Sequence, residues 1–138
     1  MKGNKILMGG ITGGIVLFLA GGLLYGLLLG DFITENMGTA SGVNKDVPDM
    51  LWLIIGNLAY GFLLSIILGS WANKTTWLEG AKSSVIVGVL LAVFFDTMMY
   101  ATTNIYNLTA IFIDIIAVTV MSAIAGAAIG YVLGMGKK

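Results

Sequence analysis

The chain of 138 residues contains no cysteine, no histidine and no arginine, and it has a single proline. These absences exclude a thiol nucleophile, a disulfide framework and a Ser-His-Asp triad, and they leave only carboxylates as zinc ligands. The net charge of zero, without a basic cluster, argues against binding to nucleic acid. We therefore expect no catalytic residues, no metal site and no cofactor, and we predict that the protein is not an enzyme.

Charge of either sign is scarce. Only 10% of the residues are charged, 58% are hydrophobic, and the mean hydropathy is +0.98. A soluble domain of ordinary composition carries about 25% charged residues. The composition predicts an integral membrane protein whose first partner is the lipid bilayer.

Four apolar segments are long enough to cross a bilayer, which takes about 20 helical residues. They cover approximately residues 6–29, 50–71, 83–100 and 108–135 and form one domain, with a polar loop at 31–49. Lipid offers no water to unpaired backbone groups, so each segment is expected to be a helix. The first apolar stretch is too long for a cleaved signal peptide, and we expect it to be a retained span. The predicted fold is an all-α antiparallel four-helix transmembrane bundle.

The lysines predict the orientation of this bundle. They precede the first span, connect the second to the third and end the chain, at Lys2, Lys5, Lys74, Lys82, Lys137 and Lys138. The 31–49 loop has the opposite character, with four acids, Asp31, Glu35, Asp46 and Asp49, against Lys45. Because cytoplasmic loops are enriched in lysine and arginine, both termini are expected in the cytoplasm.

Small residues recur at four-residue spacing along three of the predicted helices. These are Gly22, Gly26 and Gly30 in the first, Gly61, Ser65 and Gly69 in the second, and Ser122, Gly126, Gly130 and Gly134 in the fourth. Membrane helices associate through such small faces because they allow close backbone approach. Some could pack within the monomer, and others could bind a second copy or another membrane protein.

Two aspartates, Asp96 and Asp114, interrupt the third and fourth apolar segments. Helical spacing places Asp96 on one face with Tyr100 and Thr103. The predicted polar site near the outer mouth of the bundle consists of Tyr25, Asn57, Asp96, Tyr100, Thr103 and Asp114.

A carboxylate in the membrane costs roughly 2.5–3.5 kcal/mol on insertion scales, so it should face the protein interior and have partners. No lysine lies at this depth of the predicted bundle. Hydrogen bonds, a bound cation or protonation could each compensate the acids, and the pair could share one proton. The other interpretation is a structural cluster that fixes how the helices dock.

Three stretches of the chain are GGLLYGLLLGDF (21–32), ATTNIYNL (101–108) and FIDIIAVTVMSAIAGAAIG (112–130). In these stretches the chain resembles the bacterial "domain of unknown function 1761" family of small four-helix membrane proteins. The resemblance implies a location in the bacterial inner membrane. It implies no particular activity.

Two functional hypotheses follow from these observations. The first is a non-catalytic structural or accessory subunit that associates through its glycine-rich faces, as a homo-oligomer or in a larger membrane complex. The alternative is a small proton- or cation-coupled transporter or channel that uses Asp96 and Asp114. Polar side chains are few in the predicted inner halves of the helices, and this favours the accessory role.

Overall fold

The computed structural model describes residues 2–136, and over this range the protein is all-helical without a strand. The helices are α1 (Lys2–Leu23), α2 (Gly30–Glu35), α3 (Met50–Ile66), α4 (Trp77–Thr102) and α5 (Leu108–Gly134). Two π-helical segments, η1 (Leu24–Leu28) and η2 (Ile67–Trp71), extend α1 and α3. Four of the resulting helices, of 22 to 27 residues, are long and apolar enough to cross a membrane. The prediction of an all-helical fold with four helices of span length is confirmed.

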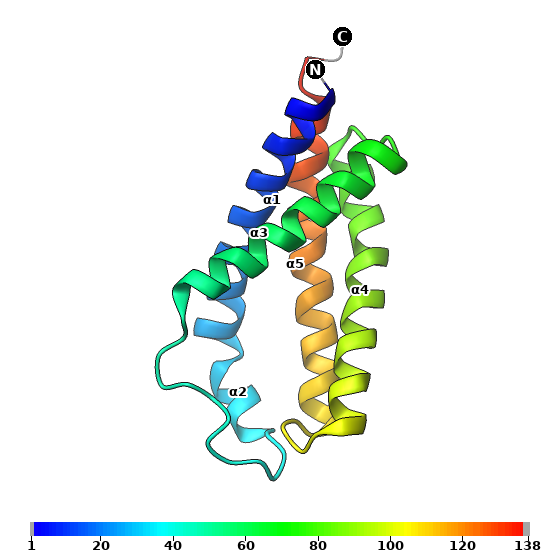
Figure 1. Ribbon diagram of the computed structural model, residues 1–138. Helices are drawn as coiled ribbons and strands as arrows, with labels where there is room; N and C mark the ends of the chain where they lie inside the picture. Colours follow the sequence, from blue (N-terminus) through cyan, green and yellow to red (C-terminus); the bar gives the residue numbers. More distant parts are fainter. Residues whose placement is uncertain (1, 137–138) are drawn as a thin grey trace.

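The long helices form an open bundle rather than a ring of equal neighbours. α1 packs between α3 and α5, and α4 packs along α5 (Figure 1). α3 crosses α1 obliquely, contacts α5 at a few positions and makes almost no contact with α4 along the described residues. One face of α3 and one face of α4 are therefore left without a helix of this chain against them.

The termini and the connections between the long helices divide between the two ends of the molecule. The chain termini lie at the same end as the connection between α3 and α4, and the other two connections lie at the opposite end (Figure 1). Six lysines were used above to predict the orientation. One of them, Lys5, donates a hydrogen bond to the carbonyl oxygen of Met135. Lys137 and Lys138 lie outside the described residues, as does the side chain of Lys2.

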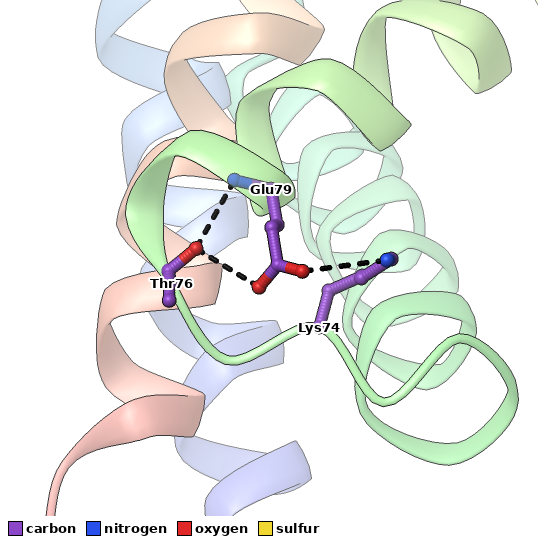
Figure 2. A network of polar contacts seen from close by, with 3 residues as sticks. All are labelled: Lys74, Thr76 and Glu79. Atoms are coloured by element: carbon purple, nitrogen blue, oxygen red, sulfur yellow. Dashed lines mark hydrogen bonds and ion pairs between the residues drawn. The ribbon is translucent and has the colours of Figure 1, made fainter.

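The α4 helix begins at Trp77, before the predicted span of 83–100, because Thr76 caps it (Figure 2). The Thr76 hydroxyl accepts a hydrogen bond from the Glu79 backbone N–H (3.3 Å) and donates one to the Glu79 carboxylate (3.0 Å). Lys74 forms an ion pair with the same carboxylate at 3.4 Å. A threonine followed three residues later by a glutamate is a known sequence signal for a helix start.

Glycine allows close backbone approach at two helix pairs. A Cβ atom added at Gly126 of α5 would lie 2.5 Å from the carbonyl oxygen of Gly80 in α4. A Cβ atom added at Gly61 of α3 would lie 2.6 Å from the carbonyl oxygen of Gly10 in α1. Gly130 and Gly134 of α5 approach backbone atoms of Thr76 and Thr75 in the same way. In α3 and η2, the Ser65 hydroxyl donates to the Ile6 carbonyl oxygen, and Gly69 packs against side chains of Ile6 and Leu133.

Gly22 and Gly26 lie in a different environment. No atom of the described chain outside their own helix turn lies within 4 Å of a Cβ added at either residue. Gly30 meets only the carbonyl oxygen of Tyr25, which belongs to the preceding turn. These three residues therefore make no helix–helix contact within the described part of the monomer.

A hydrophobic cluster fills the bundle from its middle toward the end that holds the termini. Its buried members are Leu17, Leu64, Leu68, Met121, Ala125, Ile129 and Leu133. Beside it, the hydroxyls of Tyr60 and Ser122 form a hydrogen bond of 2.7 Å that joins α3 to α5. The opposite half of the bundle is less tightly filled and contains the candidate site.

Candidate functional site

A hydrogen bond between Tyr25 and Asp114 joins the first and last long helices. Tyr25 lies on η1, and its hydroxyl donates to Asp114 Oδ1 of α5 at 2.6 Å. Wide π-helical turns of the η1 type occur frequently at functional sites.

Asp96 of α4 lies beside this pair. Asp96, Asp114 and Tyr25 line one cavity of about 200 Å³, and the two carboxyl groups interact electrostatically. Asp96 Oδ2 is buried and accepts no hydrogen bond from the described residues. Asp96 therefore places an unpaired carboxyl oxygen in the cavity that Asp114 also lines.

At the end away from the termini, this acid cavity is lined by Ile33 of α2 and by Tyr106 of the connection between α4 and α5. The covering segments are held to each other by backbone hydrogen bonds. The N–H of Gly38 donates to the Ile105 carbonyl (2.8 Å), and that of Ala40 donates to the Asn104 carbonyl (2.9 Å). This pairing fixes the loop after α2 over the two acids.

Tyr106 completes the polar lining from outside the spans. Burial raises the pKa of the Tyr106 hydroxyl, and the negative charges of Asp114 and Asp96 raise this pKa further. The phenol therefore keeps its proton next to the acids. Tyr106 was not among the residues predicted from sequence, because helical periodicity says nothing about a side chain that lies in a connecting loop.

The six predicted polar residues divide into two groups. Tyr25, Asp96 and Asp114 line the acid cavity, whereas Asn57, Tyr100 and Thr103 lie elsewhere. The Asn57 amide donates to the Leu53 carbonyl oxygen one turn earlier in α3 (2.8 Å). Tyr100 is 46% exposed, and the Thr103 hydroxyl ends α4 by donating to the Met99 carbonyl oxygen (2.8 Å). Tyr100 and Thr103 both line an open hollow on the surface of the molecule, beside the connection between α4 and α5.

A groove of about 500 Å³ between α3 and α4, the α3–α4 groove, reaches Asp96 and Asp114 from the side of the bundle. Its walls are apolar side chains of α3 and α4, including Ala59, Leu63, Leu91 and Phe95, and Asp96 and Asp114 also line it. The acid pair thus lies between the covered cavity and a groove on the side of the bundle. On the side of the termini, the hydrophobic cluster around Leu17 and Ile129 closes the bundle.

Comparisons of the chain with protein-family models, with curated proteins and with solved structures found no match. The resemblance to the "domain of unknown function 1761" family therefore stays a prediction.

Proposed function

We propose that the protein is a non-catalytic accessory subunit of a membrane complex, and that a helix of its partner occupies the α3–α4 groove. The single observation that carries this proposal is the position of Asp96 and Asp114 in the lining of an apolar groove on the side of the bundle. Carboxylates of membrane proteins face protein or water-filled cavities because lipid leaves them without partners. A partner helix in the groove would separate both acids from hydrocarbon.

The proposed topology is antiparallel, with both termini in the cytoplasm. Lys5, Lys74 and Lys82 belong to the end of the molecule that holds the termini, and the acidic 31–49 loop belongs to the other end. This asymmetry supports the orientation through the positive-inside rule. The acid cavity would then open toward the outer side, in keeping with the bacterial inner-membrane location that the family resemblance implies.

Native mass spectrometry of the complex, extracted in mild detergent at native expression, tests the accessory role. A double variant, Leu63→Trp with Leu91→Trp, should fill the α3–α4 groove and release the partner. Leu27→Trp is the matched control, because Leu27 is 77% exposed and does not line the groove. A wild-type particle that contains only one copy of this chain would refute the proposal, and a particle of several copies would identify the partner as the protein itself.

The second candidate function is proton-coupled transport, and the specific observation that favours it is the Asp96–Asp114–Tyr25 cluster. A proton fits this site better than a metal ion. Calcium takes about 6–8 oxygen ligands, and residues 2–136 hold no group of three acidic, histidine or cysteine side chains that could bind a metal. The closed hydrophobic half of the bundle argues against a continuous pathway in this conformation.

Proton flux into liposomes, followed with a pH-sensitive dye, separates the two functions. A transporter should show flux that Asp96→Asn and Asp114→Asn abolish, whereas Asp31→Asn, an exposed acid outside the cavity, should leave it unchanged. Flux equal to that of empty liposomes would reject transport. Flux that persists in both cavity variants would reject the acid pair as its route.

A further inference from the structure

Another groove, the α1–α3 groove, has a volume of about 540 Å³ and lies where α3 diverges from α1. It is lined by residues of α1, η1 and α3, by Pro48 of the loop before α3 and by Met121 of α5; the residues from the first three elements include Phe18, Gly22, Gly26, Met50 and Leu53. It is separate from the α3–α4 groove, and neither acid lines it.

The lining of the α1–α3 groove suits hydrocarbon. Gly22 and Gly26 expose their backbone to its open space, since no atom of the described chain beyond their own turn lies within 4 Å of a Cβ added there. The two polar side chains in the lining already have partners. Tyr25 donates to Asp114, and Asn57 donates to the carbonyl oxygen of Leu53. The other eight lining residues have apolar side chains or no side chain, so the groove suits the apolar surface of a ligand.

The length of the groove indicates an acyl chain of one leaflet rather than a helix. From Phe18 to Gly26 it follows α1 and η1 over eight residue steps, or about 12 Å at the α-helical rise of 1.5 Å per residue. One leaflet occupies about 15 Å, half of a hydrocarbon core of about 30 Å. Beyond this stretch the contact between Gly61 and Gly10 closes α3 onto α1. A transmembrane helix would continue through both leaflets, whereas an acyl chain would end where the groove ends.

The charge beside the groove indicates the lipid headgroup. Pro48 and Met50 line the groove, and two exposed acids, Asp46 and Asp49, lie near them in the chain, against the single exposed Lys45 beside Asp46. Across the whole 31–49 loop four acids oppose one lysine. Such a surface attracts an ammonium group and repels an anionic headgroup.

We propose that the α1–α3 groove is a lipid site, which binds one acyl chain of an outer-leaflet phospholipid whose headgroup bears an ammonium group. Tyr25 lines both this groove and the acid cavity. A lipid bound in the groove would therefore lie against the same tyrosine that donates to Asp114. The proposal stands independently of the accessory role, because it concerns a different surface.

Native mass spectrometry of the full chain tests this site, after extraction from vesicles of equal parts phosphatidylethanolamine, phosphatidylglycerol and phosphatidylcholine. The wild type should retain phosphatidylethanolamine in preference to phosphatidylglycerol. The double variant Gly22→Leu with Gly26→Leu fills the groove, and retention should fall by at least about tenfold, since each methylene that loses its place weakens binding. Gly56→Leu is the matched control, because Gly56 is also a helical glycine with open space but lies outside the groove.

A second variant separates chain binding from headgroup selection. Asp46→Asn with Asp49→Asn should still retain a phospholipid and should lose the preference for the ammonium headgroup. Equal lipid retention by the groove-filled variant and the wild type would overturn the proposal. So would preferential retention of phosphatidylglycerol, or a second protein chain bound in place of lipid.

Discussion

Substitution of Gly126 by alanine should force α4 and α5 apart. A Cβ atom at this position would lie 2.5 Å from the carbonyl oxygen of Gly80 and would also collide with the side chain of Ser84. Rotation of the serine hydroxyl does not relieve the collision, because the Gly80 oxygen belongs to the α4 backbone. Ordinary contact begins near 3.4 Å, so the local helix separation must increase by about 0.9 Å (3.4 − 2.5).

The expected cost follows from the tightness of this contact. Overpacking a well-packed interface typically destabilises a protein by about 1–3 kcal/mol. That range corresponds to a decrease of about 5- to 150-fold in the ratio of folded to unfolded protein. The helix propensity of alanine exceeds that of glycine by about 0.8–1.0 kcal/mol and offsets part of the loss. We expect a net destabilisation because the neighbouring close contacts at Gly80 and Gly130 lengthen together.

Reversible unfolding in mixed micelles, followed by circular dichroism, measures the free energy of unfolding of each variant. Gly22→Ala is the control, since it makes the same chemical change where no described atom of another segment lies within 4 Å. The control should be as stable as the wild type or more stable. Equal stability of Gly126→Ala and Gly22→Ala would show that α4 and α5 do not pack as closely at Gly126 as described here.

Three further predictions concern single side chains. Tyr25→Phe removes the hydrogen bond to Asp114 and should destabilise the protein by about 0.6–1.7 kcal/mol in micelles. A double-mutant cycle with Asp114→Asn measures the interaction free energy of the two side chains, and a value of zero would contradict the hydrogen bond. Burial and the nearby Asp114 charge raise the pKa of Tyr106 above its ordinary value of 10.0, so the folded state keeps the proton after the unfolded state has lost it. Stability should therefore fall as pH rises above 10.0, with a smaller fall in Tyr106→Phe, and equal falls would exclude this residue as the cause. Thr76→Ala removes the cap that bonds the Glu79 N–H and should cost about 0.5–2 kcal/mol in thermal unfolding, whereas Thr76→Ser should restore most of it.

The helical fold was predictable because a bilayer admits few alternatives. Four apolar stretches near the length of a span can satisfy their backbone groups only as helices, and four such helices are present. The start of α4 at Trp77 was also encoded locally, in the spacing of Thr76 and Glu79, although hydropathy alone placed the span later. The small-residue row of α4 at Gly80, Ser84 and Gly88 has the same four-residue spacing as the predicted rows and could have been found.

The candidate site was only partly predictable. Periodicity and depth grouped Asp96, Asp114 and Tyr25, and these three do line one cavity. The same reasoning also included Asn57, which lines the α1–α3 groove because α3 crosses α1 obliquely. Tyr106 was missed because its position depends on the pairing between two loops.

The sequence by itself determined which functional groups this protein has and which of its segments can enter a bilayer, because both depend on composition alone. The absence of cysteine, histidine and arginine, and the length of the apolar segments, belong to that part. Tertiary structure alone decided which small residues meet and which remain open. Gly126 and Gly22 are both helical glycines in rows of four-residue spacing, yet one touches a neighbouring backbone and the other faces a groove. That difference arises from the crossing of α3 over α1 and the close packing of α4 on α5, and helix crossing depends on contacts between segments far apart in the chain.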